Sequence, residues 1–259
     1  MNLQEMKDKL EKTFEIEPWI LELEKDTRAG AKKLLESWNK KRELVLLTRE
    51  LHQEKVDYDR SYTKSRNDLV AGVDEAGRGP LAGPVVTAAV ILAENTERLV
   101  GLNDSKQLSK LKREELAAII KEVAISYSIH FQSVEKIDQL NIYEATKQSM
   151  VEAVNTLEVR PHVVLVDAMK LPIEIETHSI IKGDALSLAI AAASILAKTA
   201  RDQYMENLHE EFPQYLFHKH AGYGTKEHVE KIMEYGPTEH HRKTFEPIKS
   251  LLLKSEVNV

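Results

Sequence analysis

Apolar residues recur along the chain in two rhythms, and the rhythm changes near position 69. Before that point they stand three and four positions apart, as Leu44, Leu47 and Leu51 do, which predicts helices. After it, short apolar runs rich in β-branched residues alternate with longer amphipathic stretches. The runs predict strands and the stretches predict helices. The sequence therefore predicts an α/β domain over residues 69–259, preceded by a helical extension over residues 1–68.

The predicted elements of the α/β domain alternate along the chain. Strands are expected over residues 69–74, 84–93, 125–131, 162–167 and 178–181. Helices are expected over residues 108–123, 141–157 and 185–208, with a last helix after Thr225. The helix that starts at Ala185 is almost wholly apolar at first and rich in alanine, so it should be buried and closely packed. A central sheet covered by helices is the expected architecture.

Composition narrows the class of protein. Of the 259 residues, 42% are hydrophobic and 30% charged, which excludes a disordered chain, a collagen-like chain and a coiled-coil rod. The chain has no cysteine, so a disulfide scaffold, a thiolate metal site and a cysteine nucleophile are excluded. The charged amino terminus is unlike a secretory signal, and the apolar stretch Leu186–Ala197 is too short to span a bilayer. We therefore expect a cytoplasmic protein with no membrane partner.

The net charge of −6 argues weakly against a nucleic-acid partner, because phosphate binding usually needs a basic surface. Net charge hides the distribution of charges, however. Histidines and basic residues gather in one stretch near the carboxyl terminus: His218, Lys219, His220, Lys226, His228, Lys231, His240, His241, Arg242 and Lys243. Acidic residues that bind divalent cations also should not be counted as repelling phosphate. The objection stays open.

Carboxylates stand at the ends of the predicted apolar runs. Asp74 and Glu75 close the first strand, Asp167 closes a later one, and Asp184 opens the buried helix. The carboxyl edge of a sheet is where α/β folds usually bind ligands. Neighbours on a strand face opposite sides, so Asp74 and Glu75 can share a site only if the strand ends or bulges there. The glycine-rich segment that follows favours such an ending.

Clustered carboxylates without cysteine favour Mg²⁺ or Mn²⁺ over zinc. Two such ions about 3.5–4 Å apart would activate a water and stabilise the leaving oxygen in phosphodiester hydrolysis. Each acid also has a plainer interpretation: Asp184 as a helix N-cap, Asp167 as a turn residue, and Asp74 with Glu75 as solvated side chains. Their shared position at strand ends favours a functional site over these plainer interpretations. The spacing of the acids along the sequence supports no more specific conclusion.

The segment Gly77–Pro84 is the most distinctive in the chain. Three glycines within seven residues bring bare backbone close to a ligand, and Arg78 between Gly77 and Gly79 can reach a phosphate or a sugar. The segment does not follow the phosphate-loop or dinucleotide-binding pattern, so no nucleotide cofactor is expected. A tight turn with an exposed arginine is the plainer alternative.

The string from Gly72 to Pro84 resembles the opening motif of ribonuclease HII. Three further motifs agree with that family in the same order, at residues 104–106, 182–202 and 218–228. The resemblance runs from about residue 69 to residue 247 and leaves residues 1–68 uncovered. It implies a ribonuclease H-like α/β fold, in which helices flank a mixed central sheet, here with an N-terminal helical extension and a C-terminal helical segment.

The resemblance implies an endoribonuclease that hydrolyses the RNA strand of RNA–DNA hybrids and cuts on the 5′ side of single ribonucleotides in duplex DNA. It also implies 3′-hydroxyl and 5′-phosphate products, a mechanism with two divalent ions, Mn²⁺ or Mg²⁺, and a role in removing ribonucleotides from DNA. The expected partners are these two kinds of duplex. The family suggests a monomer, and the sequence indicates no protein partner.

Motif position assigns roles to residues of this chain. The implied metal-binding catalytic acids are Asp74, Glu75, Asp167 and Asp184. The implied sensors of the ribose 2′-hydroxyl are Gly77, Arg78 and Gly79, and Tyr223 is the implied aromatic on the neighbouring sugar. The candidate phosphate contacts are Lys106, Lys198 and Arg201, of which the last two share a helix face. An ordinary solvated face that includes Asp202 is the alternative for that pair.

Several alternatives stay open. Ribonuclease HIII is a related enzyme with an extra N-terminal domain, but it usually has another residue in place of Arg78, and its extension contains a sheet. A binding protein that has lost catalysis would need one of the four acids changed. The histidines do not share one helical face, so substrate contacts or structural roles are favoured over zinc. Residues 1–68 fit either a module that binds a partner or nucleic acid, or a helical extension packed on the main body.

Overall fold

The computed structural model describes residues 1–102, 105 and 108–257, the last four without their side chains. The chain forms two compact units, and the boundary between them falls between residues 53 and 54, inside the long helix α3 (Ala29–Arg60). The final turns of α3, from Glu54 onward, thus belong to the second unit. The domain boundary predicted after residue 68 stays a prediction.

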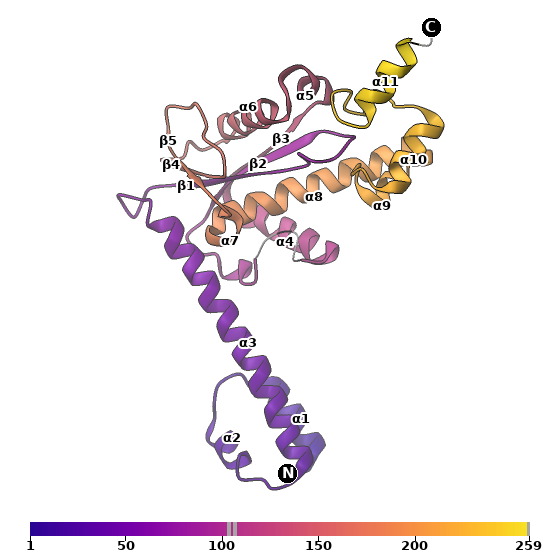
Figure 1. Ribbon diagram of the computed structural model, residues 1–259. Coiled ribbons are helices and arrows are strands. Elements are labelled where there is room, and N and C mark those ends of the chain that lie inside the picture. The colour runs from indigo at the N-terminus through magenta and orange to yellow at the C-terminus, as the bar shows by residue number, and fades with distance from the viewer. Residues whose placement is uncertain (103–104, 106–107, 258–259) are drawn as a thin grey trace. The chain divides into compact units, whose positions relative to one another are not determined.

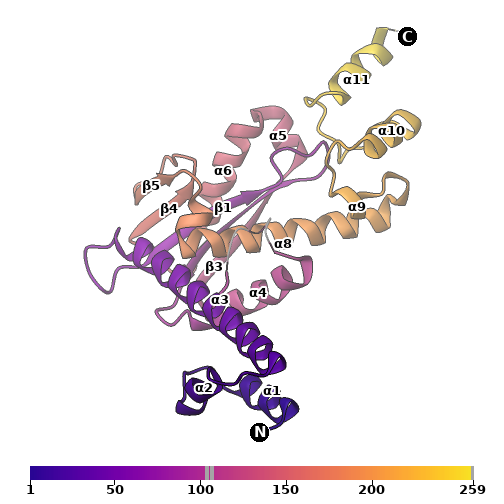
Figure 2. The same ribbon diagram turned by 60° about the horizontal axis from the view of Figure 1, so that its bottom comes forward.

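The first unit is a cluster of helices, as predicted. It contains α1 (Leu3–Lys12), α2 (Pro18–Leu23) and the first part of α3 (Figure 2). A capping box at Asn2 starts α1, and a proline starts α2. Seven buried side chains form its small core: Met6, Leu10, Ile20, Leu23, Ala31, Leu35 and Trp38.

The second unit contains a mixed five-stranded sheet, which confirms the predicted architecture. Its strands are β1 (Val70–Ala76), β2 (Val85–Leu92), β3 (Ala124–Gln132), β4 (Val163–Asp167) and β5 (Glu176–Ile180). They lie in the order β3-β2-β1-β4-β5. The pairs β1–β2 and β2–β3 are antiparallel, and β1–β4 and β4–β5 are parallel.

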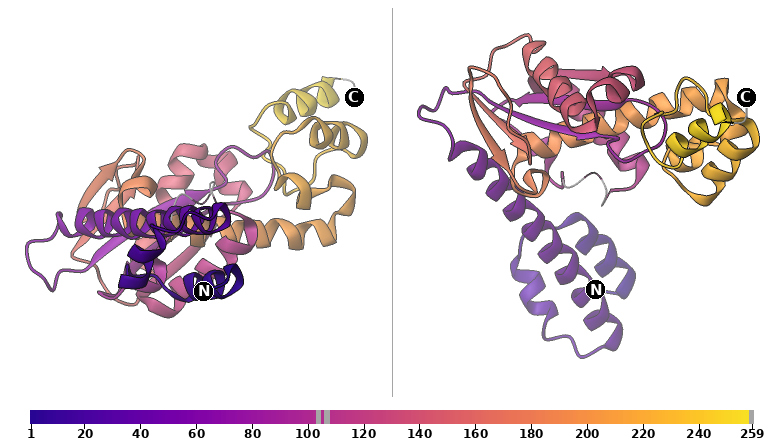
Figure 3. Two further views of the ribbon diagram at one scale, coloured as in Figure 1. Left: turned by 90° about the horizontal axis from the view of Figure 1, so that it is seen from below. Right: turned by 45° about the horizontal axis from the view of Figure 1, so that its top comes forward.

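Helices cover both faces of this sheet (Figures 1 and 3). One face carries α4 (Lys110–Val123) and α8 (Leu188–Glu211), and the other carries α5 (Val134–Leu140) and α6 (Ile142–Asn155). The alanine-rich start of α8 is buried, as its sequence predicts, because small side chains let the helix lie close to the strands.

The helix α8 approaches the sheet closely at Gly72 on β1. A Cβ atom there would lie 2.0 Å from the carbonyl carbon of Ala189 and 2.2 Å from the nitrogen of Ile190. These backbone atoms cannot move aside for a Cβ atom as a flexible side chain could. We expect Gly72→Ala to destabilise the protein by about 3 kcal/mol, measured by urea unfolding. Ala88→Gly on β2, which only deletes a methyl group, is expected to cost less; a larger loss from that variant would contradict this explanation.

The remaining elements follow β5 or connect the others. They are η1 (Glu97–Leu99), α7 (Gly183–Leu186), η3 (Pro213–Tyr215), α9 (Phe217–His220), α10 (Lys226–Tyr235) and α11 (Ile248–Val257). The helix predicted from residue 185 is divided, because Ser187 is extended and its side chain caps α8. The prediction that α10 is the last helix was wrong, since α11 follows it. In the described part of the chain, no helix has the length and apolar character needed to cross a membrane.

Candidate active site at the carboxyl end of β1 and β4

Asp74 and Asp167 lie side by side at the sheet edge. Val73 pairs with Val166 in the parallel β1–β4 ladder, so the next residues on the two strands are level. Asp74 also pairs with Ala88, which packs against α8, so its side chain is on the α8 face. The sequence placed both acids at strand ends, and the register brings them together.

The environment of Asp74 makes its negative charge costly. The residue is 5% exposed. Burial, together with the charges of Glu75 and Asp167, raises the pKa of Asp74 well above its ordinary value. Hydrogen bonds from the hydroxyl of Ser194 and from the N–H of Glu75, the latter 2.7 Å long, act in the opposite direction. A buried carboxylate repelled by two others is a place where a bound cation is favourable.

Ser194 supports Asp74 and was not among the predicted site residues. It is buried on α8, and its Oγ lies 3.2 Å from the Oγ of Ser105, which is also buried. The two hydroxyls therefore form a short chain that ends at the Asp74 carboxylate. The available signal was a single serine inside the otherwise apolar run at residues 188–197.

The side chain of Glu75 projects from β1 on the face of the sheet opposite that of Asp74. The expected end or bulge at this point was wrong, since β1 continues to Ala76. Glu75 pairs with Thr87, whose hydroxyl binds Ser149 on α6, so the backbone directs Glu75 toward the α6 face. Glu75 is nevertheless the first β1 residue beyond the end of β4, at an open edge. Its Oε1 lies 3.5 Å from Nη1 of Arg78 in the glycine-rich loop.

Asp184 is tied to Asp167 through the backbone. The N–H of Gly183 donates to Oδ1 of Asp167 at 2.7 Å, which fixes the start of α7 beside β4. Asp184 follows in the first turn of α7. The N-cap position of α7 belongs to Lys182 in a left-handed conformation, and that of α8 to Ser187. The plainer interpretation of Asp184 as an N-cap is therefore wrong.

The donor set suits hard divalent cations. Its side chains offer carboxylate oxygens, and the repulsion around Asp74 would be relieved by positive charge. Among the residues that the structure describes, no three acidic or histidine side chains are close enough to enclose a metal ion. The described side chains thus form no closed metal-binding cage, and Asp74 and Asp167 are the two acids that the strand register places side by side.

Two buried arginines hold the glycine-rich loop. Arg201, 1% exposed on α8, donates to the carbonyls of Pro84, Ala221 and Ala82 at 3.0–3.1 Å. A Cβ on Gly77, whose φ is +96°, would lie 2.0 Å from Nε of Arg201. The predicted phosphate contact does not fit a guanidinium group buried in this way. Arg201 positions the loop instead.

Arg242 is the second of these arginines, and it was not among the predicted site residues. It is fully buried and donates to the carbonyls of Gly77, Arg78 and Gly83 at 2.6–3.1 Å. Burial lowers the pKa of Arg242 to about 9 and that of Arg201 to about 10, so both remain protonated at neutral pH. Nothing local in the sequence marks this role, because the bonded carbonyls are more than 150 positions away.

Tyr223 stands beside the loop. Its side chain is 47% exposed, and its Cε1 is 3.6 Å from where a Cβ of Gly79 would be. The loop thus connects two of the predicted groups: Gly79 borders the tyrosine ring, and Arg78 borders Glu75. An exposed aromatic ring next to bare backbone can contact a sugar or a base.

Two histidines hold the backbone of Tyr223. The N–H of Thr238 donates to Nδ1 of His241 at 3.0 Å, so His241 carries its proton on Nε2. That Nε2 lies 3.2 Å from Nε2 of His228, whose Nδ1 donates to the Tyr223 carbonyl at 2.9 Å. Burial lowers the pKa of His228 to about 4 and that of His241 to about 3, so both are neutral. The histidine cluster is structural here, one of the roles favoured over zinc.

The other two predicted phosphate contacts are placed differently. Lys198 is partly exposed on α8, and its Nζ is 2.6 Å from Oδ1 of Asp202, so its phosphate contact stays a prediction. The alternative of an ordinary solvated face does not hold for Arg201, which is buried. Lys106 lies outside the described residues.

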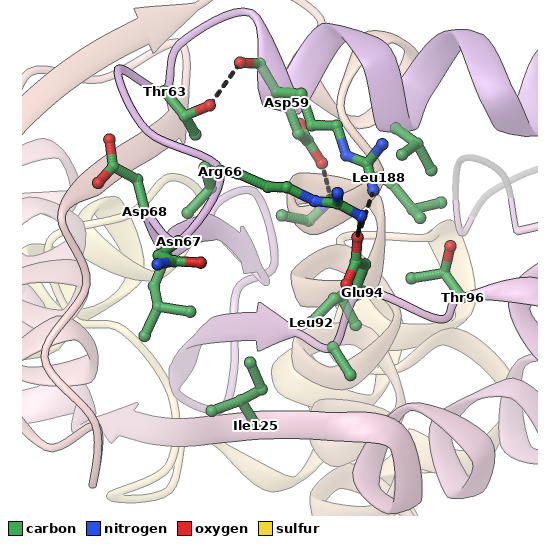
Figure 4. Close-up of a pocket in the computed structure, with 16 residues that line it drawn as sticks. Asp59, Thr63, Arg66, Asn67, Asp68, Leu92, Glu94, Thr96, Ile125 and Leu188 are labelled. Carbon is green, nitrogen blue, oxygen red and sulfur yellow. Dashed lines mark hydrogen bonds and ion pairs between the residues drawn. The ribbon is translucent and has the colours of Figure 1, made fainter.

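A cavity of about 470 Å³ lies at the other end of the sheet (Figure 4). Its lining includes Val70, Leu92 and Ile125, at the ends of β1, β2 and β3 that are remote from the carboxylates. The ion pair between Arg66 and Glu94, 2.8 Å long, borders it. It is separate from the acids, the loop and Tyr223.

Comparisons with known proteins identify the family. The family profile described as Ribonuclease HII matches residues 71–247, and the profile Ribonuclease HII N-terminal domain matches residues 2–63. A ribonuclease HII of Lactobacillus helveticus is 48% identical over 248 residues, which cover 96% of this chain and 98% of that protein.

Solved structures show the same fold. Ribonuclease H2 from Pyrococcus horikoshii has a TM-score of 0.64 at 29% identity, covering 73% of this chain and 99% of that one. The RNase HII of Archaeoglobus fulgidus, solved in complex with PCNA, has a TM-score of 0.58 at 27% identity, covering 69% and 95%. Bst-RNase HIII, solved with Mn²⁺, has a TM-score of 0.55 at 20% identity, covering 73% and 71%.

These matches span both units of the chain, and the helical extension is part of what is matched. The profile match and the relative from Lactobacillus favour ribonuclease HII over the HIII alternative. The chain belongs to the ribonuclease HII family, whose members are endonucleases acting on RNA–DNA hybrids.

Proposed function

We propose that this enzyme cuts DNA duplexes on the 5′ side of a single embedded ribonucleotide, in addition to hydrolysing RNA–DNA hybrids. The observation that carries the proposal is the position of the glycine-rich loop between Tyr223 and the acids. Such a loop can test one sugar for a 2′-hydroxyl while Tyr223 contacts the next sugar. Removal of ribonucleotides from DNA is the role that this specificity serves.

Four acids would hold two divalent ions in this proposal. Asp74 and Asp167, level on neighbouring strands, would hold the central positions, and Glu75 and Asp184 would complete or flank them. The bound ions would supply charge neutralisation and an activated water for hydrolysis, leaving 3′-hydroxyl and 5′-phosphate ends. The Mn²⁺ complex of the structurally similar Bst-RNase HIII supports Mn²⁺ or Mg²⁺ as the ions.

The loop would read the ribonucleotide with its backbone. Arg201 and Arg242 hold its carbonyls from inside the protein, so its shape is fixed before substrate binds. The 43% exposed side chain of Arg78 remains near the acids, where it can meet a phosphate. A loop held in this way selects a sugar by close approach rather than by adapting to it.

Substitution of Tyr223 tests the specificity. Tyr223→Ala is expected to lower kcat/KM for a single-ribonucleotide duplex by about 10-fold, because an aromatic contact to a base or sugar is worth about 1–3 kcal/mol. The melting temperature should change little, since the ring is half exposed. Tyr235→Ala removes another half-exposed tyrosine, on α10, and should cleave normally. A large thermal loss in Tyr223→Ala with an unchanged substrate preference would make Tyr223 a structural residue.

Comparison of two substrates tests the proposed function itself. Wild-type enzyme should cleave both a uniform RNA–DNA hybrid and a DNA duplex with one ribonucleotide, in Mg²⁺ or Mn²⁺, and EDTA should stop both reactions. Efficient cleavage of the hybrid alone would favour activity like that of ribonuclease HIII. The proposed substrate is genomic DNA, so the expected place of action is the cytoplasm.

A further inference from the structure

The last turns of α3 reach the backbone around Asp184. Lys55 and Asp59 are one helical turn apart and belong to the same compact unit as the sheet. Lys55 is only 8% exposed, which is unusual for a lysine. Burial raises the pKa of Asp59 to about 6, and the charge of Lys55 acts against that rise. Two buried charges on one helix need a structural or functional reason.

Lys55 binds the main chain of a proposed catalytic residue. Its Nζ lies 3.3 Å from the carbonyl oxygen of Asp184 and 3.4 Å from that of Leu102. The ammonium group donates to both, so it joins the start of α7 to the end of the segment that precedes Ser105.

Asp59 holds the other side of the same turn. Its Oδ2 accepts a hydrogen bond of 2.9 Å from the N–H of Ala189, in the first turn of α8. In Figure 4, Asp59 and Leu188 lie on the wall of one cavity. An acceptor at this place satisfies an amide that the helix leaves without an internal partner.

The helix α7 depends on such outside contacts. It has four residues, Gly183–Leu186, between a left-handed Lys182 and an extended Ser187. So short a helix has few hydrogen bonds of its own, among them the 2.8 Å bond from the Ser187 N–H to the Gly183 carbonyl. Its place is set by the hydrogen bond from its first residue to Asp167 on β4 and by the contact of Lys55 on α3 with the Asp184 carbonyl.

We propose that Lys55 and Asp59 are positioning residues that place Asp184 for metal binding. The proposal rests on the metal-binding role proposed above for Asp184. It gives the end of α3 a specific task, since Lys55 and Asp59 fall within the match to the N-terminal domain and outside the match to the main Ribonuclease HII profile. The N-terminal segment would then contribute to catalysis through its final turns.

Metal affinity measured apart from cleavage tests the proposal. Lys55→Met keeps the length of the side chain and removes the donor. We expect it to weaken Mn²⁺ binding, measured by titration calorimetry on the full chain, by about 10-fold, as for other residues that orient metal ligands. The Mn²⁺ concentration that half-saturates hybrid cleavage should rise by a similar factor. Lys64→Met, the same change at an exposed lysine, should alter neither value.

A pair of Asp59 variants gives an independent answer. Asp59→Asn retains an acceptor for the Ala189 amide and should bind Mn²⁺ nearly as wild type does, whereas Asp59→Ala should show the same weakening as Lys55→Met. If Lys55→Met fails to fold by circular dichroism, Lys55→Gln and this pair decide the matter. A loss of stability alone would lower the melting temperature without moving the half-saturating Mn²⁺ concentration.

The outcomes separate this proposal from the proposed function. Wild-type Mn²⁺ affinity and half-saturation in folded Lys55 and Asp59→Ala variants would overturn the positioning role, even with full activity on ribonucleotide-containing DNA. Failure of wild-type enzyme to cut at a single ribonucleotide would overturn only the proposed specificity, because the Mn²⁺ titrations would still report on Asp184.

Discussion

Asp74→Asn is expected to lower the rate of hybrid cleavage by at least about 10³-fold, the scale of loss when a group that stabilises the transition state is removed. Asparagine keeps the shape of the side chain and removes its charge. Asp74 lies between two other acids at the edge of β1 and β4, so its loss should weaken metal binding at the centre of the site. Single-turnover cleavage of a labelled hybrid measures the effect.

The same substitution is expected to leave the metal-free protein as stable as wild type, or more stable. The pKa of Asp74 is raised in the folded state, so its carboxylate costs stability above the ordinary pKa of aspartate; this cost is largest above the raised value and shrinks to nothing as the pH falls from the raised value to the ordinary one. Asparagine removes the cost at neutral pH. Asp68→Asn, in a loop where two N–H groups bind the carboxylate, is the control and should retain cleavage. Near-normal turnover of Asp74→Asn would exclude Asp74 from the mechanism.

Arg242→Ala is expected to cause the largest loss of stability, about 4 kcal/mol. The substitution leaves a cavity and three buried carbonyls, those of Gly77, Arg78 and Gly83, without their donor. Because all three carbonyls are in the glycine-rich loop, cleavage of the single-ribonucleotide duplex should fall more than the folded fraction does. Denaturant unfolding and kcat/KM on both substrates measure the two effects.

Two further variants isolate the geometry of Arg242. Arg242→Lys keeps the positive charge but not the planar fork, so we expect it to recover less than half of the lost stability. Lys243→Ala, at the next, exposed position, should match wild type in both measurements. A stable Arg242→Ala protein with normal kinetics would mean that the loop keeps its shape without this arginine.

Much of the fold was predictable because its signals are local. Strands such as β2 and β4 are apolar, β-branched runs between turn residues, and α6 has one clear apolar face. The end of β1 was less predictable. The sequence indicates an ending at Asp74, but backbone pairing with β2 carries the strand on to Ala76. Pairing is a long-range property that a local pattern does not contain.

The four acids and the glycine-rich loop could be identified from sequence motifs, but the residues that hold them in place could not. Ser194, Arg201 and Arg242 act through contacts to residues far away in sequence. For Arg201, motif position suggested a phosphate contact, yet the fold buries this side chain against three carbonyls. The positions of Lys55 and Asp59 likewise depend on where α3 meets the turn before α8.

Nucleotide-resolution mapping of the cut in a DNA duplex with one ribonucleotide is the sharpest test of the proposed specificity. We expect a single incision on the 5′ side of the ribonucleotide, with 3′-hydroxyl and 5′-phosphate ends, in the presence of Mg²⁺ or Mn²⁺. An incision on the 3′ side, or an intact duplex under conditions in which a uniform hybrid is cleaved, would contradict it.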